Sequence, residues 1–286
     1  MSLPEKYYGK YLCRSYRLKT GKRLRLKKPK TFSEKIQWLK IYDNLPIKTQ
    51  LTDKVLVRDY VKDKIGEKFL KPVIQVCSSF DEINFESLPD SFVVKCNHGC
   101  KWHFIIKDKK SYLEDAVLFD YTRSNIYEWM RQSFFGWSDF ETQYRNIQPA
   151  ILIEPLLREK VDEPCEEIEV YCFNSIPRVF QRKKHVGTSC HISTFDENYC
   201  SLDLKFHPKH VVIKDDTADE YIREAVELSK ELAKDFKLVR VDWQIYKNHL
   251  YFEEMTFTPY SGFFVFSGGY EDWDIKLGKI LNLKGG

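Results

Sequence analysis

The 286-residue sequence is poor in glycine and proline and has no long apolar run. It contains 12 glycines and 11 prolines, too few for a linker-rich or low-complexity protein. No stretch reaches the roughly 18 consecutive apolar residues that a membrane-spanning helix needs. The first residues also lack the apolar core of a secretory signal, so we expect a cytoplasmic protein whose eight cysteines are reduced thiols.

Apolar and aromatic residues are abundant, at 43% and 15% of the chain. This composition allows a large core and excludes disorder over most of the sequence. Patterns typical of helices alternate with patterns typical of β-hairpins, and we find no internal repeat. We therefore predict a mixed α/β (α+β) fold.

Positive charge is concentrated in one segment. The formal net charge is only +4, yet residues 14–30 contain nine Lys or Arg residues and no acidic one. Such a segment is either a solvated face or a contact with something anionic, such as lipid headgroups, an acidic glycan or nucleic acid. Nucleic acid is the weakest of these because no recognised binding motif accompanies the charges.

Local patterns predict the order of the elements. One helix starts after Thr31, which has capping-box spacing with Glu34, and a second starts at Asp53, a suitable N-cap, and ends near Gly66. Further on we predict strands at 70–77, 91–95, 102–106 and 150–157, a helical region at 112–132, hairpins at 166–182 and 237–255, and a helix at 218–236. We predict a long irregular loop at residues 183–216, and such loops are often functional.

A lysine ends the apolar strand at 91–95, and a polar loop follows it. Lys95 would need a partner if it were buried, and a phosphate is a good one. Backbone N–H groups of the loop could bind phosphate oxygens. The ordinary alternative is an exposed strand-end lysine, and the sequence lacks the G-x-x-x-x-G-K-[ST] pattern of a Walker loop.

Cysteine and histidine residues offer zinc as a weaker interpretation. Two sets are possible: Cys96, His98, Cys100 and His103, and the more scattered Cys190, His191, Cys200, His207 and His210. Structural zinc usually uses two separated ligand pairs. Side chains on a strand–loop–strand would not all point one way, which argues against the first set.

Charged residues interrupt the last predicted hairpin. Alternation places Arg240 and Asp242 on one face of the strand, and an aspartate inside a strand is disfavoured by propensity. A second carboxylate from the adjacent strand would make a pair suited to Mg²⁺ bridged to nucleotide phosphates. The alternative is a surface ion pair between Arg240 and Asp242.

Taken in order, six segments resemble the ATP-grasp enzymes, specifically the TupA-like ATP-grasp family of the teichuronopeptide-biosynthesis protein. They are PKTFSEKIQWL at 29–39, TDKVLVR at 52–58, FVVKCNHG at 92–99, IEPL at 153–156, YCFN at 171–174, and RVD at 240–242 through EMTFTPYSGF at 254–263. The resemblance implies an ATP-grasp fold, with the nucleotide between two α+β subdomains built on antiparallel sheets. It implies a basic helical segment at 1–50, a lid subdomain at 51–149 and a C-terminal subdomain with the metal site at 150–286.

The resemblance also implies residue roles. The implied nucleotide-binding residues are Lys54 and Lys95 for the phosphates, His98 and Gly99 in the phosphate loop, Glu154 and Leu156 in the hinge that reads adenine, and Glu167 for the ribose. Asp242 and Glu254 are the implied Mg²⁺ ligands, and Thr256 stands where many members carry an asparagine ligand. Arg240, with Lys95, is the implied catalytic cation.

The hairpin turn conflicts with this assignment. A two-residue turn at 247–248 would pair Asp242 with Glu253, whereas the family spacing requires Glu254. A β-bulge near the end of the hairpin would reconcile the two. We therefore predict Glu254 as the ligand and keep Glu253 as the alternative.

The implied activity is that of a ligase in bacterial surface-polysaccharide (capsule, lipopolysaccharide or teichuronopeptide) biosynthesis. MgATP would activate a carboxylate as an acyl phosphate, and an amine or amino acid would then form an amide with an acidic sugar or lipid-linked glycan. The alternatives are a glycosyltransferase on the same polysaccharide, a kinase-like phosphotransferase, and a nucleotide-binding module without catalysis. No nucleophile–histidine pattern in the sequence calls for covalent catalysis.

Two basic segments are hypothesised to contact acidic partners. Residues 183–216, with Arg182, Lys183, Lys184 and His185 at their start, would bind the acidic acceptor. Residues 14–30 would touch the anionic inner leaflet of the membrane.

Overall fold

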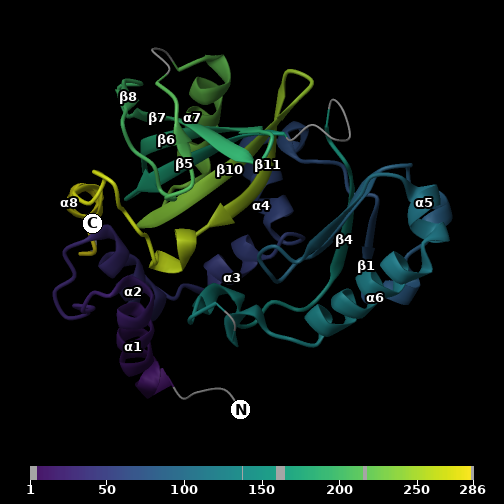
Figure 1. Cartoon of the computed structure of the whole chain (residues 1–286), viewed down its shortest axis with the longest axis horizontal. Helices are drawn as coiled ribbons and strands as arrows, with labels where there is room; N and C mark the ends of the chain where they lie inside the picture. Colours follow the sequence, from purple (N-terminus) through teal and green to yellow (C-terminus); the bar gives the residue numbers. More distant parts are fainter. Residues whose placement is uncertain (1–4, 137, 159–164, 215–217, 285–286) are drawn as a thin grey trace.

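Two β-sheets and the helices packed on them make up the chain (Figure 1). The computed structural model describes residues 5–136, 138–158, 165–214 and 218–284. Nearly all neighbouring strands are antiparallel, and helices cover both sheets. The predicted mixed α/β class with antiparallel sheets is confirmed.

The smaller sheet has four antiparallel strands in the order β1-β4-β2-β3. Its elements are β1 (Gln75–Cys77), β2 (Phe92–Cys96), β3 (His103–Ile106), β4 (Ile151–Pro155), α5 (Lys109–Glu114) and α6 (Ala116–Met130). Phe92, Val94 and Ile153 form its core with Ile126 of α6. The predicted helical region at 112–132 is two helices, because the Asp115 side chain accepts the Leu118 N–H and caps the start of α6.

The larger sheet has the strand order β11-β10-β5-β6-β7-β8, and β9 pairs with β7 in parallel. Its strands are β5 (Glu166–Phe173), β6 (Ile176–Val186), β7 (Ser189–Asp196), β8 (Ser201–Leu202), β9 (Val211–Val212), β10 (Leu238–Tyr246) and β11 (His249–Thr256). Both predicted hairpins form. Asn174 and Ser175 have positive φ of 49° and 67°, as two-residue hairpin turns require. α7 (Glu220–Leu232) packs on this sheet, where Trp243 Nε1 donates to Ser229 Oγ at 2.9 Å.

The remaining helices surround the larger sheet. They are α1 (Tyr8–Thr20), α2 (Phe32–Tyr42), α3 (Pro46–Thr52), α4 (Val57–Ile65) and α8 (Trp273–Ile280). Short 3₁₀ turns lie at Glu5–Tyr7, Glu67–Phe69, Phe80–Glu82, Phe85–Ser87, Phe134–Gly136, Thr142–Tyr144 and Pro259–Gly262. The capping box of Thr31 and Glu34 starts α2 as predicted. Helix α4 starts four residues later than predicted, because the Asp53 carboxylate accepts the Val55 N–H and caps the intervening turn instead.

Two predictions from local patterns are wrong. Residues 183–216 are not a long irregular loop, because β6 continues to Val186 and β7, β8 and β9 follow. Polar side chains on both faces of β7 conceal its alternation, since Thr194 is buried and hydrogen-bonded to Gln181. The strand expected at 70–77 is only β1, because only Gln75–Cys77 pair with β4 whereas Leu70 bridges to Phe252 of the larger sheet.

The two sheets divide after Pro155 rather than at residue 150. Strand β4 pairs with β1 and β2 in the smaller sheet. The division into segments 1–50, 51–149 and 150–286 stays a prediction, although β4 of the last segment lies in the smaller sheet. None of the helices in the described ranges has the length and apolar character needed to cross a bilayer.

Candidate active site

A cleft of about 330 Å³ lies between the two sheets. Its size is within the range of small-molecule sites. Most of the predicted site residues line it: Lys54, Lys95, Gly99, Glu154, Leu156, Glu167, Arg240, Asp242 and Glu254. The fold therefore brings these predicted residues from distant segments of the chain together in one cleft. Two predicted residues are exceptions. His98 and Thr256 do not line the cleft.

A β-bulge sets the position of the two predicted metal ligands. Asp242 lies directly opposite Glu254, and the register then shifts so that Trp243 pairs with Phe252. Glu253 is the extra residue in this bulge, as the family spacing required. On its other side Asp242 lies opposite Glu169 of β5. Three carboxylates therefore stand in one row on three adjacent strands, facing the cleft.

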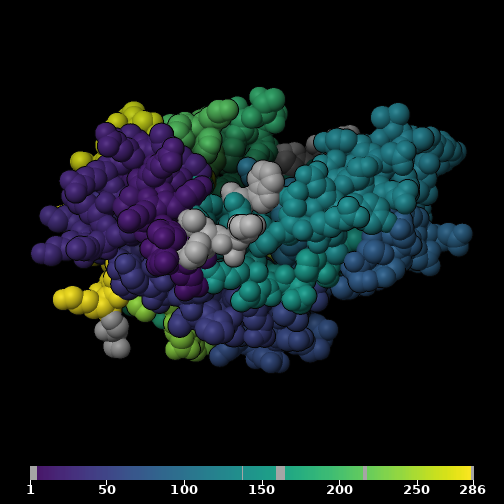
Figure 2. Space-filling model, turned by 90° about the horizontal axis from the view of Figure 1, so that it is seen from below, coloured from purple at the N-terminus to yellow at the C-terminus, as the bar shows by residue number. Residues whose placement is uncertain are grey.

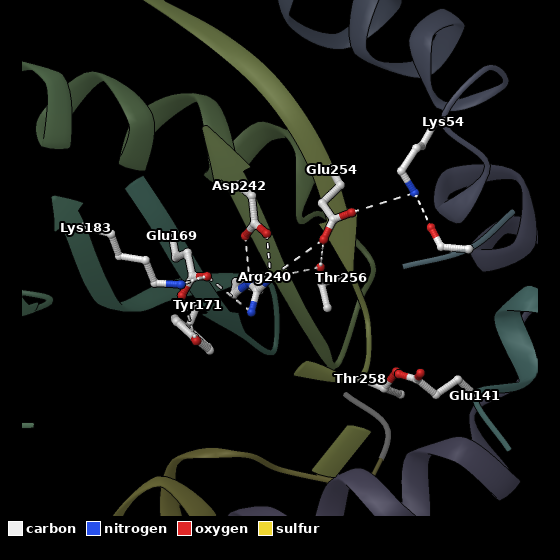
Figure 3. A network of polar contacts seen from close by, with 11 residues as sticks. Lys54, Glu141, Glu169, Tyr171, Lys183, Arg240, Asp242, Glu254, Thr256 and Thr258 are labelled. Atoms are coloured by element: carbon white, nitrogen blue, oxygen red, sulfur yellow. Dashed lines mark hydrogen bonds and ion pairs between the residues drawn. The ribbon is translucent and has the colours of Figure 1, made fainter. Parts of the chain in front are cut away.

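Arg240 is the cation that contacts all three carboxylates of this row (Figure 3). Its Nε and Nη2 donate to the two oxygens of Asp242 at 2.6 and 2.5 Å. Its Nη1 lies 3.4 Å from Glu169, and Nη2 lies 3.7 Å from Glu254. Burial, opposed by Arg240 and reinforced by Glu169 and Glu254, raises the pKa of Asp242 to about 8. One guanidinium therefore does not offset the negative charge of three adjacent carboxylates.

The donor set at Asp242 and Glu254 fits Mg²⁺. This ion binds through one or two carboxylates and takes its remaining ligands from phosphate oxygens and water. Thr256 Oγ1 donates to Glu254 at 3.0 Å and accepts from Arg240 at 3.3 Å, so its hydroxyl orients both groups. In the described part of the chain, no group of three or more His, Cys, Asp or Glu residues could hold a metal. The zinc interpretation is therefore not supported, and a metal here would depend on a phosphate-bearing substrate.

Glu169 is buried and has three partners. It forms ion pairs with Lys183 and with Arg240, and it accepts the Tyr171 hydroxyl at 3.0 Å. Burial opposes its charge, but Arg240 and Lys183 outweigh burial and lower the pKa of Glu169 to about 2. Burial likewise opposes the charge of Lys183, yet Glu169 raises the pKa of Lys183 above its ordinary value.

The basic stretch predicted to bind an acidic acceptor is already neutralised. Lys183 pairs with Glu169, Arg182 pairs with Glu166 and Asp219, and Lys184 lies 3.2 Å from Glu166. These side chains belong to β6 rather than to an irregular loop. The hypothesis that they recognise an acidic acceptor stays a prediction, and such an acceptor would have to displace these carboxylates.

Lysines and carboxylates alternate on the other side of the cleft. Lys95 Nζ lies 2.7 Å from Glu154 and 3.4 Å from Glu253. Lys71 pairs with Glu253 and with Gln244. Burial and the charge of Lys95 lower the pKa of Lys71 to about 7. Glu253 therefore faces the lysines, whereas Glu254 faces Asp242.

Lys54 connects the phosphate loop to the carboxylate row. Its Nζ donates to the Gly99 carbonyl at 2.8 Å and lies 4.0 Å from Glu254 (Figure 3). A Cβ on Gly99 would lie 2.2 Å from the Trp102 ring, so only glycine fits there. His98 is buried, and its Nε2 lies 3.0 Å from the Trp129 carbonyl. The assignment of the His98 side chain to nucleotide binding is therefore corrected: it anchors the loop from behind.

The residues predicted to form the hinge lie at the end of β4 and just after it. Leu156 follows β4 and lines the cleft, and its N–H makes a long hydrogen bond of 3.4 Å to the Ser91 carbonyl. The Glu154 carboxylate points at Lys95, so it is engaged by a cation. Glu167 lines the cleft from β5, two residues before Glu169.

Sequence reasoning missed Glu169 and Lys71. Glu169 had a detectable signal, since it shares a strand face with Glu167 and lies inside an apolar strand. Lys71 had no detectable signal in the sequence, because it lies outside every helix and strand that the structure describes. Its partner Glu253 is the extra residue of the β-bulge.

The sequence matches the family described as TupA-like ATPgrasp over residues 34–282. No curated protein sequence matches this chain significantly. Among similar solved structures is D-alanine–D-alanine ligase from Bacillus anthracis, with 16% identity, a TM-score of 0.44, and coverage of 72% of this chain and 57% of that one. The Helicobacter pylori D-alanine–D-alanine ligase has 14% identity, a TM-score of 0.43, and coverage of 87% and 69%. The ATP-grasp ligase PsnB complexed with a minimal precursor has 11% identity, a TM-score of 0.43, and coverage of 83% and 62%.

These structural likenesses are distant. The chain spans 57% of the length of the Bacillus anthracis enzyme, and all three TM-scores are below 0.5.

Breaking the buried ion pair between Lys183 and Glu169 should lower the free energy of unfolding. Replacing Lys183 with Met leaves Glu169 buried with fewer partners, and we expect a loss of about 3–5 kcal/mol in the free energy of unfolding, measured in urea. The exposed pair of Arg178 and Glu197 is the control. Arg178→Met should cost less than about 1 kcal/mol. Equal losses in the two variants would contradict a special role for the buried pair.

The stabilising effect of Glu169 should disappear in acid. Its folded-state pKa of about 2 is below the ordinary value of 4.5, so the ionised side chain stabilises the fold above the ordinary value and this effect fades as pH falls toward 2. The difference in unfolding free energy between wild type and Glu169→Gln should shrink there by up to about 1.4 kcal/mol per pH unit. A difference that stays constant from about pH 6 to about pH 3 would refute this linkage.

Proposed function

The chain belongs to the TupA-like ATP-grasp family, and from this premise we propose that it is an ATP-dependent carboxylate–amine ligase. One observation carries the proposal: the paired carboxylates Asp242 and Glu254 share a cleft with Lys54 and Lys95. Phosphoryl transfer needs cations that position the phosphates and carboxylates that hold the metal.

The nucleotide would lie along the cleft between the sheets. Leu156 would contact the base through its backbone, and Glu167 would contact the ribose hydroxyls. Lys54 and Lys95 would bind the phosphates under the loop that contains Gly99. Both lysines have carboxylate partners now, so phosphate oxygens would replace a carboxylate in each case.

Mg²⁺ would be held by Asp242 and Glu254, and when bound it offsets charge on the phosphate oxygens. Asp242 would then release the guanidinium of Arg240. Arg240 would keep its ion pair with Glu169, whose carboxylate oxygen lies 3.4 Å from Nη1. Thr256 would maintain the orientation of Glu254 through its hydroxyl. Arg240 would be left facing the transferred phosphoryl group and the tetrahedral oxyanion that forms next.

The proposed reaction has two steps. A substrate carboxylate oxygen takes the γ-phosphoryl group of ATP, which gives an acyl phosphate and ADP. An amine then attacks the carbonyl carbon, and inorganic phosphate leaves as the amide forms. Positioning and charge stabilisation account for the catalysis, so no nucleophilic side chain is needed.

The proposal extends to the substrates and to the biosynthetic pathway in which the ligase acts. We propose that an amino acid or another amine is joined to an acidic sugar or lipid-linked glycan during surface-polysaccharide biosynthesis. The support is the family membership rather than any contact in the cleft. A cytoplasmic site of action and a peripheral contact with an anionic membrane are proposals of the same kind.

Ligand-induced thermal shifts test the nucleotide assignment. MgATP at about 100 times its Kd should raise the unfolding midpoint by roughly 3–6 °C, because it binds only the folded state. Lys95→Ala and Asp242→Asn should each lose the shift, whereas Lys230→Ala, an exposed residue of α7, should keep it. A shift with a UDP-sugar and none with MgATP would instead place the protein among the glycosyltransferases. A positive result justifies screening pairs of amines and uronic acids for ADP release.

The glycine of the phosphate loop gives a second test. Gly99→Ala should weaken ATP binding about tenfold, because the new Cβ would displace a loop held by the Trp102 ring. Trp102 also stacks on Trp129, so its ring does not yield easily. Adding Trp102→Leu should restore part of the affinity, measured by calorimetric titration. Gly136→Ala is the control, since nothing lies within 4 Å of its added Cβ. Unchanged affinity in Gly99→Ala would argue against phosphate binding by this loop.

A further inference from the structure

One face of helix α1 is apolar and exposed although it lies beside many cations. Tyr7, Tyr11, Arg14 and Leu18 are separated by four, three and four residues, so they form one line along the helix. Tyr7 is 41% exposed, Tyr11 45% and Leu18 76%. A different line of the same helix, which includes Tyr8, Leu12 and Tyr16, is buried. The helix therefore has two apolar stripes: one is buried, and the other stays largely exposed although Tyr11 contacts the Phe140 ring.

Exposed cations that have no carboxylate partner among the described residues lie on α1 beside the stripe and in the loop that follows the helix. The exposed basic residues are Lys6, Lys10, Arg14 and Arg17 at the helix, and Lys22, Arg23, Lys27, Lys28 and Lys30 in the loop after it. Within the described residues, the only cations of 5–30 that form ion pairs are Lys19, with Asp139, and Arg25, with Glu34. This face therefore combines unneutralised positive charge with exposed apolar side chains.

The face is a fixed part of the fold. Leu12, Tyr16 and Leu24 form a buried cluster beneath it, against which Phe140 and Phe263 pack. Figure 2 shows the N-terminal residues, in purple, as one continuous outer surface at one end of the molecule. The stripe and its cations are therefore presented together on a rigid support.

We propose that this α1 face binds the surface of an anionic lipid bilayer, with Tyr7, Tyr11 and Leu18 among the headgroups. Tyrosines and an aliphatic residue flanked by Lys and Arg are what an interfacial helix needs, and each basic residue near an anionic surface adds to the attraction. A nucleic-acid backbone would use the cations but not the exposed Leu18. The inference names the surface for the peripheral contact within the proposed function, and it involves no cleft residue.

Helix α6 provides an internal comparison. Its exposed apolar residues Val117 and Tyr121 are 82% and 59% exposed. Acidic residues adjoin them at Glu114, Asp115 and Asp120. The α6 patch therefore has acidic residues beside its exposed apolar side chains, unlike the α1 face. It supplies a matched control for that face.

Vesicle co-sedimentation of the full chain tests the proposal. The protein should bind vesicles of phosphatidylcholine with about one-third phosphatidylglycerol, should not bind phosphatidylcholine alone, and should dissociate as salt rises. Arg14→Glu combined with Arg17→Glu should lower the partition coefficient roughly thirtyfold or more. Leu18→Glu should lower it about tenfold through lost apolar contact. Val117→Glu, and Lys110→Glu combined with Lys230→Glu, should change it less than about twofold.

Several outcomes would overturn the proposal. They are no binding to anionic vesicles, equal binding to neutral ones, or equal losses in the control variants. Tight binding to a DNA duplex that Leu18→Glu leaves unchanged would assign the face to nucleic acid. A dimer that Leu18→Glu dissociates would assign it to a second copy of the chain. The MgATP thermal shift of the same samples separates a failure of this surface from a failure of the ligase proposal, because none of these substitutions touches the cleft.

Discussion

The contact between the Arg240 guanidinium and the carboxylate row is the constraint on which the cleft depends. Glu169, Asp242 and Glu254 stand opposite one another on three adjacent strands. Like charges at directly opposed positions destabilise a sheet, and burial adds to the penalty. Arg240 contacts all three, and Lys183 supplies a second cation at the Glu169 end. Because the cations present do not fully offset this charge at Asp242, the row has the electrostatic character of a site that accepts a further cation.

The bulge in the last hairpin lets one acidic doublet serve two sets of partners. Without it, the two-residue turn at 247–248 would place Glu253 beside Asp242. With it, Glu254 joins the carboxylate row and Glu253 turns to Lys71 and Lys95. A single extra residue thus sets both the metal-facing pair and the partners of two cleft lysines. Bulges are frequent next to active sites because they redirect side chains in this way.

Sequence patterns predicted what local chemistry specifies. The capping box at Thr31 and the hairpin at 166–182 appear where predicted, since caps and turns depend on a few adjacent residues. The carboxylate pair was predicted through family spacing, and its bulge through the conflict between that spacing and the turn. Strand β7 was missed because polar side chains such as Thr194 are buried by hydrogen bonds that only the folded sheet provides. Lys71 was missed because its partner is 182 residues away along the chain.

The net charge of +4 is the sum over two kinds of cationic region, one in the cleft and one on the α1 face. In the cleft, Lys54, Lys95 and Arg240 each have a carboxylate partner, so an anionic ligand must displace a carboxylate from a cation that is already engaged. Such an exchange favours ligands with several phosphates and a metal, because each displaced carboxylate needs a new cation. The exposed cations of the α1 face have no carboxylate partner in the part of the chain that the structure describes, so binding there requires no exchange and is weakened directly by salt. The same residue types therefore give selectivity where they are paired and buried, and reversible attraction where they are exposed.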